Sequence, residues 1–286
     1  MTESVSGPTP GIPCFVSVMM HDLPAGRRFY GELLGWEFEA GPEMLGPYLN
    51  AKVGGRPVAG LGGMAPGRRH PVDWVPFFST ADADSTMDRV RECGGTPAVG
   101  PMDVERAGRV ALAADPMGAV FGVWQAGVEH GTPFSTRPGS PVWTELVTVE
   151  SSMVSKFYSL VFDDEPRPEQ RDGGAGRAGR PGGTHAAGAA GEPGDYVVLY
   201  HNDRPVAGIH GVGATGLPPG HGACWVTYFA VADPEEAAER VTRLGGRVLG
   251  PVSRAPFGDF VRATDPEGAP FGLVRPSDPA SPPAGG

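Results

Sequence analysis

The sequence RPVAGL at residues 56–61 returns as RPVAGI at residues 204–209, and this repetition decides the fold. Further pairs recur in the same order along the chain: Trp74 with Trp225, Gly94-Gly95 with Gly245-Gly246, and Asp115-Pro116 with Asp265-Pro266. Matches that keep their order over such a length indicate an internal duplication. The chain of 286 residues therefore consists of two copies of one unit.

Each copy contains the same order of predicted elements twice. In the first copy, an apolar strand at residues 14–19 precedes a helix at residues 23–34, for which Asp22 is a suitable N-cap. Strands follow at residues 48–53 and in the RPVAGL segment. Each copy thus reads βαβββ twice. This order predicts an α+β fold, in which a curved mixed sheet carries its helices outside and leaves the other face as a concave cup.

The repeat also sets the expected boundaries. They are a first domain at residues 11–126, a linker at 127–138, a second domain at 139–275, and disordered tails at 1–10 and 276–286. Residues at about 165–194 have no counterpart in the first copy and are rich in Gly, Ala and Arg. Such a composition cannot bury enough apolar surface to offset the entropy of ordering, so we expect a flexible insert. A mobile lid over a site is the functional alternative.

Composition excludes several classes of protein. The net charge of -10 disfavours nucleic acid as a partner, because phosphate neutralisation needs clustered Lys and Arg. No apolar run reaches the ~18 residues of a membrane helix, and the N-terminus does not resemble a secretory signal. Three cysteines without paired spacing favour neither a disulfide framework nor a cysteine-based zinc site. We therefore expect a cytoplasmic protein without nucleic-acid or membrane partners.

Five motifs follow one another in the first copy: Asp22, Phe29-Tyr30, the LLGW sequence at residues 33–36, Gly94-Gly95, and Asp115-Pro116-x-Gly118. Their order resembles the vicinal oxygen chelate superfamily, which contains glyoxalase I, extradiol dioxygenases, and bleomycin and fosfomycin resistance proteins. Two copies in one chain are similar to the tandem actinobacterial members. The resemblance implies two tandem glyoxalase-like domains, each with a small-molecule site in its cup.

In the metal-dependent members, four His, Gln or Glu side chains inside the cup ligate one divalent ion. The resemblance places these positions at Phe15, Gly60, Pro76 and Gly122 in the first copy, and at Trp143, Gly208, Thr227 and Gly272 in the second. Of the eight, only Thr227 has a side-chain oxygen, whereas a divalent site needs about three donors. We therefore expect that the usual metal site is absent from both cups and that no cofactor is bound.

Aromatic residues at former ligand positions predict a cup that binds a small molecule. The residues expected to face the cups and contact a ligand are Phe15, Ser17, Tyr48, Asn50, Phe78 and Trp124 in the first copy, and Trp143, Tyr196, Thr227 and Phe229 in the second. Core packing is the alternative role of each aromatic residue. The glycines opposite them are expected to leave room for a flat molecule.

Glu145 and His210 form an acid–imidazole pair expected on the inner face of the second cup. They could act as general base and acid, hold a displaced metal ion, or form a salt bridge. Because the second cup is the more polar one, the sequence favours it as the functional cup.

These observations predict a metal-free protein that binds a small aromatic or amphipathic molecule, with antibiotic sequestration as one role that the resemblance implies. One alternative is a cofactor-independent or flavin-assisted tailoring enzyme of secondary metabolism, such as a hydroxylase, cyclase or epimerase, in which Tyr196 steadies an oxyanion. Another is a metal-dependent lyase or dioxygenase with displaced ligands. The sequence leaves open whether the protein is an enzyme. It allows either a monomer with an internal pseudo-twofold axis or a homodimer.

Overall fold

The structure is a computed structural model that describes residues 9–67, 70–127, 134–168, 195–255 and 257–277. The expected tail residues 1–8 and 278–286, linker residues 128–133 and insert residues 169–194 lie outside the described residues. None of the described helices has both the length and the apolar character needed to span a membrane.

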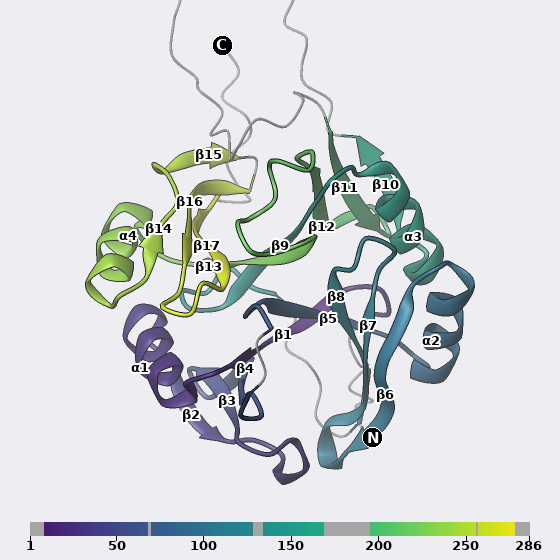
Figure 1. Cartoon of the computed structure of the whole chain (residues 1–286), viewed down its shortest axis with the longest axis horizontal. Coiled ribbons are helices and arrows are strands. Elements are labelled where there is room, and N and C mark those ends of the chain that lie inside the picture. The colour runs from purple at the N-terminus through teal and green to yellow at the C-terminus, as the bar shows by residue number, and fades with distance from the viewer. Residues whose placement is uncertain (1–8, 68–69, 128–133, 169–194, 256, 278–286) are drawn as a thin grey trace, which may run out of the picture.

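The first copy forms an eight-stranded sheet with the order β2-β3-β4-β1-β5-β8-β7-β6 (Figure 1). Its elements are β1 (Pro13–Met20), α1 (Leu23–Leu34), β2 (Glu37–Ala40), β3 (Tyr48–Val53), β4 (Arg56–Gly63), β5 (Trp74–Ser79), α2 (Ala83–Glu92), β6 (Thr96–Val104), β7 (Gly108–Ala114) and β8 (Val120–Ala126). Two βαβββ units meet where β1 pairs antiparallel with β5. Within each unit the first strand pairs in parallel with the last. The first cup is therefore formed by strands of one copy.

The second copy forms a nine-stranded sheet with the order β10-β11-β12-β9-β13-β17-β16-β14, and β15 pairs with β16. Its elements are β9 (Pro141–Thr148), α3 (Ser152–Phe162), β10 (Glu165–Pro168), β11 (Tyr196–His201), β12 (Arg204–Gly211), β13 (Cys224–Ala230), α4 (Pro234–Arg243), β14 (Arg247–Val248), β15 (Ser253–Ala255), β16 (Gly258–Thr264) and β17 (Pro270–Pro276). The start of the expected flexible insert was placed wrongly, because Glu165–Pro168 forms an edge strand on β11, as β2 does on β3. At Glu165–Pro168, backbone pairing with β11 outweighs a composition that disfavours ordered structure.

Aspartate caps begin three of the four α-helices that the structure describes. The Asp22 carboxylate accepts a hydrogen bond from the backbone N–H of Ala25, and Asp82 accepts one from Ser85. Asp233 accepts two, and Pro234 begins the helix that follows it. These bonds satisfy N–H groups that lack partners within a helix, so short local sequences fix where the helices start.

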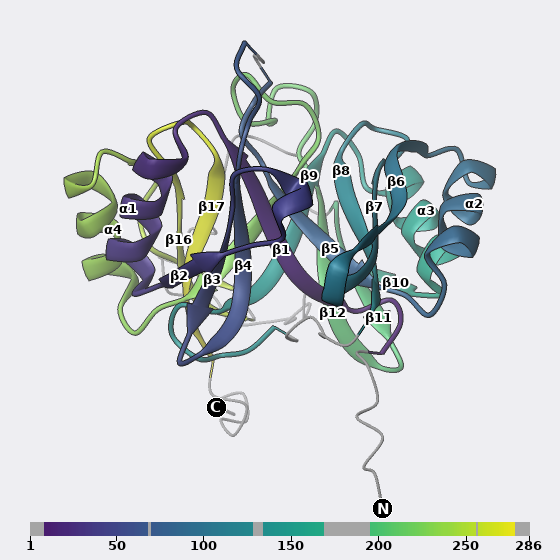
Figure 2. The same cartoon turned by 90° about the horizontal axis from the view of Figure 1, so that it is seen from below.

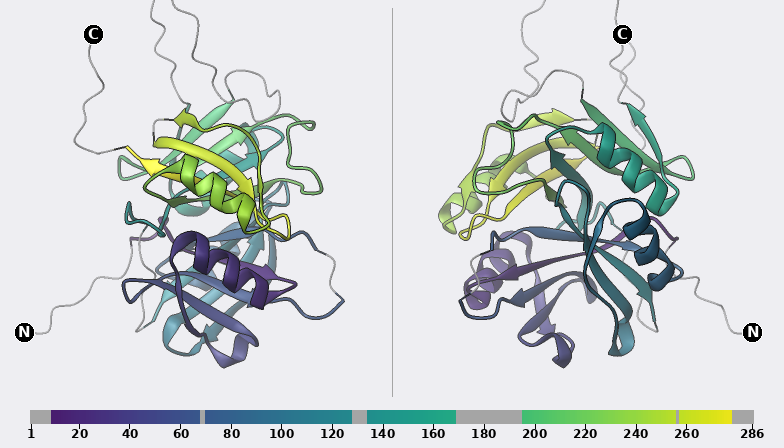
Figure 3. Two further views of the ribbon diagram at one scale, coloured as in Figure 1. Left: turned by 90° about the vertical axis from the view of Figure 1, so that its left-hand side faces the viewer. Right: turned by 45° about the vertical axis from the view of Figure 1, so that its right-hand side comes forward.

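The helices bring the two copies together. Helix α1 lies beside α4 at one side of the molecule, and α2 lies beside α3 at the opposite side (Figures 1 and 3). The aromatic core under each pair mixes both copies: the Phe229 ring lies 5.4 Å from Trp36 and 5.1 Å from Trp74. On the opposite side, Phe78 stacks on Phe162 at 4.8 Å. The cores therefore lie on the helix faces of the sheets and between the copies.

A reciprocal hydrogen-bond chain joins the copies at each core. Tyr30 donates to the Asp265 carboxylate at 3.0 Å and accepts from the Trp74 indole. Its counterpart, Tyr158, donates to Asp115 at 3.2 Å. Burial raises the pKa of Asp115 to about 6. The Asp-Pro-x-Gly turns thus hold the two copies together as well as shaping a connection between strands.

The side chains of β5 and β13 lie on the opposite faces of their sheets from those that the sequence predicted. Phe78, Thr227 and Phe229 were expected to face the cups, but their side chains are fully buried, and the two phenylalanines belong to the cores on the helix side. Pro76 is on the same face of β5 as Phe78, because side chains alternate along a strand. The sequence of β5 is apolar at almost every position, so it carries no alternation from which the register could be read.

Candidate functional site

The first cup contains an apolar cavity of about 250 Å³. The rings of Phe15, Phe77 and Trp124 contribute to its wall. Phe15 and Trp124 meet edge to face at 5.1 Å, an arrangement that holds both rings in place. Pro42, Leu45, Val75, Val110 and Leu112 complete much of the apolar surface. The cavity is thus suited to a small, mostly apolar molecule.

Polar groups on the cavity wall come from β1 and β3. The hydroxyls of Ser17 and Tyr48 lie 2.8 Å apart, and the Asn50 side chain is on the same wall. Burial raises the pKa of Tyr48 to about 12, so its hydroxyl is neutral at physiological pH and can donate a hydrogen bond. The structure thus places the five predicted residues Phe15, Ser17, Tyr48, Asn50 and Trp124 around one cavity. Their contact with a ligand stays a prediction.

The glycines at former ligand positions lie under aromatic rings of the protein itself. A Cβ atom at Gly60 would overlap the Tyr48 hydroxyl, and one at Gly122 would overlap the Phe77 ring. The second cup repeats this arrangement, with Tyr196 over Gly208 and Tyr228 over Gly272. These glycines therefore accommodate the protein's own rings, where the sequence predicted space for a ligand.

The eight residues that the resemblance places at metal positions do not fit a divalent cation. Rings fill the space into which four of the eight ligands would project. Thr227, the one residue with a side-chain oxygen, is on the helix face of β13, and its hydroxyl has no hydrogen-bond partner. Divalent ions need several donors converging within about 2.0–2.6 Å, which glycine and aromatic rings cannot supply.

Aromatic side chains of the second cup pack against one another. Trp143 stacks on Phe257 with ring centroids 5.9 Å apart, and Tyr228 contacts Phe257 at 5.2 Å and Phe260 at 5.7 Å. Tyr228 is fully buried. The cavity described above thus lies in the first cup, whereas the sequence favoured the second as the functional one.

A charged network occupies the floor of the second cup. The Glu145 side chain is only 3% exposed and forms an ion pair with the Arg262 guanidinium. Tyr196 donates a hydrogen bond to the other Glu145 oxygen at 3.1 Å, and Arg262 donates to the Tyr228 hydroxyl at 2.8 Å. His210 Nδ1 lies 3.8 Å from Glu145. The network assembles side chains from β9, β11, β12, β13 and β16.

The electrostatics of this network bear on the roles predicted for Glu145 and His210. Burial alone would raise the pKa of Glu145, but the Arg262 charge, together with His210 and Tyr196, lowers it below the ordinary value. A carboxylate held in its charged form is a weak base. The Arg262 guanidinium also pairs with Glu145 Oε1, the same oxygen that lies 3.8 Å from His210 Nδ1. Glu145 forms its close ion pair with Arg262, and the alternative roles of Glu145 and His210 stay predictions.

Sequence reasoning missed Arg262, Phe77, Tyr228 and Phe257. A signal for Arg262 was present, because the repeat aligns it with Leu112 of the first copy, and an arginine within an apolar strand pattern requires a partner. Phe77 and Tyr228 were missed because the predicted orientation of side chains on β5 and β13 was shifted by one residue. Phe257 lies in a turn, where no periodicity indicates the direction of a side chain.

The comparisons with known proteins agree with this architecture. The family model described as the Glyoxalase/Bleomycin resistance protein/Dioxygenase superfamily matches residues 154–273. The anthracycline biosynthesis protein DauV of Streptomyces sp. (strain C5) is 32% identical over 286 residues, covering 93% of this chain and 94% of that protein. The chain belongs to the glyoxalase/bleomycin resistance protein/dioxygenase superfamily.

Solved structures from this superfamily share the fold at low sequence identity. The 2,3-dioxygenase LapB from Pseudomonas sp. KL28 has a TM-score of 0.60 and 13% identity, covering 96% of this chain and 97% of that chain. The Mn(II)-bound glyoxalase from Novosphingobium aromaticivorans also has a TM-score of 0.60, with 17% identity, covering 94% and 84%. The predicted fold of two tandem glyoxalase-like units is thereby confirmed.

Proposed function

We propose that the first cup binds a planar aromatic molecule of secondary metabolism, of the oxygenated polycyclic class to which anthracyclines belong, without a metal ion in the cup. The observation that carries this proposal is the apolar cavity walled by Phe15, Phe77 and Trp124. Three rings around one hollow offer stacking and edge contacts to a flat ligand. A relative named for anthracycline biosynthesis, similar over nearly its whole length, supports this ligand class.

The polar groups of the cavity suit such a ligand. The Ser17 and Tyr48 hydroxyls bond to each other, and each keeps further capacity to donate or accept. A quinone carbonyl or a phenol of the ligand would form a hydrogen bond with the Ser17 or Tyr48 hydroxyl. Asn50 is close by on the same wall. The rest of the ligand would stay in contact with apolar side chains.

The direct test titrates the full chain with 1,8-dihydroxyanthraquinone, a planar tricyclic probe, and follows quenching of tryptophan fluorescence. Trp124→Leu should weaken binding roughly tenfold, since it removes a ring of the wall. His210→Gln, a change in the second cup, is the matched control and should leave the affinity unchanged. The opposite pattern, in which only His210→Gln weakens binding, would place the ligand in the second cup and overturn the proposal.

A tailoring enzyme is the second candidate, and the Ser17–Tyr48 pair is the observation that favours it. A neutral phenol beside a bound carbonyl can stabilise developing negative charge. Incubation of the probe with the protein, followed by mass spectrometry, distinguishes the two candidates. An unchanged ligand mass supports binding alone, whereas a mass change that Tyr48→Phe abolishes indicates turnover.

A further inference from the structure

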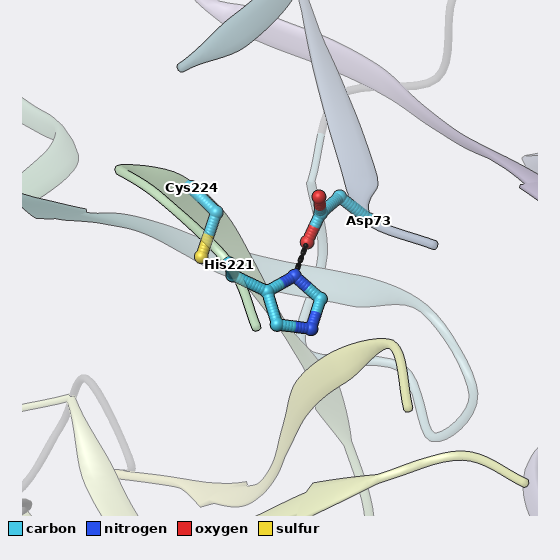
Figure 4. Close-up of side chains that lie close together, drawn as sticks. All are labelled: Asp73, His221 and Cys224. Atoms are coloured by element: carbon cyan, nitrogen blue, oxygen red, sulfur yellow. Dashed lines mark hydrogen bonds and ion pairs between the residues drawn. The ribbon is translucent and has the colours of Figure 1, made fainter. Parts of the chain in front are cut away.

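A second cluster of reactive side chains lies outside both cups, at the junction of the two copies. Asp73 immediately precedes β5, and Cys224 is the first residue of β13, with His221 shortly before it. Figure 4 shows the three side chains close together, with His221 and Asp73 in contact, and Figure 2 shows the β4–β5 and β12–β13 connections projecting at the same end of the molecule. None of the three residues lines the cavity of the first cup or belongs to the Glu145–Arg262 network of the second.

The donor atoms of the three residues are close enough to share one ion. One atom of each residue, a carboxylate oxygen, an imidazole nitrogen and the thiol sulfur, lies within 4.8 Å of the other two. His221 Nδ1 is 2.7 Å from Asp73 Oδ1. A tetrahedral zinc site places such ligands about 3.3–3.6 Å apart, given its bond lengths. Small rotations of the side chains therefore suffice to close the site.

The contact between His221 and Asp73 fixes the orientation of the imidazole. His221 Nδ1 forms a hydrogen bond with the Asp73 carboxylate. Histidine ligands of metals are commonly held in one orientation by such a partner. His221 is thus already oriented within the cluster.

Burial and charge also suit a divalent cation. The Cys224 side chain is buried, that of His221 is 10% exposed and that of Asp73 is 30% exposed, so the cluster opens to solvent on the Asp73 side. Sulfur, nitrogen and oxygen donors together favour zinc among the common divalent ions. A thiolate and a carboxylate neutralise the charge of Zn²⁺, and water can reach the fourth position.

We propose that Asp73, His221 and Cys224 form a zinc site that joins the two copies. The alternative is a His–Asp ion pair beside a buried thiol that serves only in packing. The internal repeat makes Asp73 and Cys224 equivalent residues, each directly before a tryptophan of the repeat, Trp74 or Trp225. They meet because β5 and β13 lie against each other. His70, the counterpart of His221, is exposed and does not belong to the cluster.

The test uses the full chain, freed of metal by a chelator and titrated with Zn²⁺ and, separately, with Co²⁺. Zn²⁺ affinity is measured by competition with a chromophoric chelator. We expect one equivalent of Zn²⁺ to bind and to raise the melting temperature, because a ligand that binds only the folded state stabilises it. Co²⁺ should produce the near-ultraviolet absorption of a thiolate–cobalt bond. This spectrum of the unaltered protein tests the site without any variant.

Variants then assign the ligands. Cys224→Ser should abolish the cobalt–thiolate absorption, and His221→Gln and Asp73→Asn should each weaken Zn²⁺ binding by at least about 10–100-fold. Cys14→Ser, which changes an equally buried thiol of β1, is the matched control and should leave the spectrum and the affinity unchanged. Absence of stoichiometric binding by the unaltered chain, or an unchanged absorption in folded Cys224→Ser, would overturn the proposal. Neither result depends on a ligand in the first cup.

Discussion

The two cups share a framework but differ in chemistry. Tyr48 of the first cup bonds to the Ser17 hydroxyl, and its counterpart Tyr196 bonds to the Glu145 carboxylate in the same geometry. Where the first cup has Leu112, the second has Arg262, which pairs with that carboxylate. Differences at these two positions, together with Tyr228 in place of Phe77 and His210 in place of Gly62, thus separate an apolar cavity from an ion network. The comparison teaches that this fold tolerates very different cup interiors.

The reason for this tolerance is the position of the core. The aromatic clusters and the reciprocal Tyr–Asp bonds lie on the helix faces of the sheets, where the copies contact each other. Most of the apolar burial that stabilises the fold is therefore remote from the cups. After duplication, one cup could change its polarity without disturbing the contacts between the copies.

Breaking the ion network should give the largest loss in the free energy of unfolding. Arg262→Leu introduces the residue of the first cup and leaves Glu145 buried and charged without its partner. Removal of one member of a buried ion pair costs about 3–5 kcal/mol, so we expect a loss of that order in the free energy of unfolding. Urea denaturation of the variant beside the unaltered chain measures it.

The matched control changes both members of the pair. Glu145→Ser combined with Arg262→Leu gives the second cup the two residues of the first, and it should recover most of the stability lost by Arg262→Leu. If the double variant is as unstable as the single one, the network contributes through packing rather than charge, and the contrast drawn between the cups fails.

Substitution of a covered glycine should give an intermediate effect that differs between the cups. An added Cβ at Gly60 or at Gly208 overlaps a tyrosine hydroxyl in either case. Tyr48 can move into the adjoining cavity, whereas Tyr196 is held by Glu145. Gly208→Ala should therefore cost about 1–3 kcal/mol, the usual range for overpacking, and Gly60→Ala clearly less. Equal losses of unfolding free energy in the two variants would show that the first cup is as rigid as the second.

Acid should weaken the second cup but not the first. Because the folded pKa of Glu145 is lower than its ordinary value of 4.5, the folded state takes up a proton less readily than the unfolded chain. Glu145 contributes its stability at pH values above its ordinary pKa. This contribution is lost as the pH falls through the pKa that Glu145 has in the folded state. The difference in unfolding free energy between the unaltered chain and the double variant should thus shrink between pH 6 and pH 3.5. A difference that stays constant over this range would contradict the lowered pKa.

The candidate site could be predicted from the sequence only in part. Phe15 and Ser17 were placed on the cup face from the ligand position that the resemblance implies at Phe15, and Tyr48 from the alternation of apolar residues along its strand. Phe78 and Phe229 were placed on the wrong face, because an almost wholly apolar strand carries no sign of its register. The insert was similarly misjudged at Glu165–Pro168, where pairing with β11 decides the conformation.

Local patterns and repeated motifs were enough to predict the duplication, the βαβββ order, the starts of the capped helices and the superfamily. The position of the apolar cavity, the location of the core and the contacts between polar residues depend on the three-dimensional packing. Glu145 and Arg262, or Asp73 and Cys224, are far apart along the chain. Such pairs come together only when the sheets close and the copies pack, and no local pattern specifies that closure.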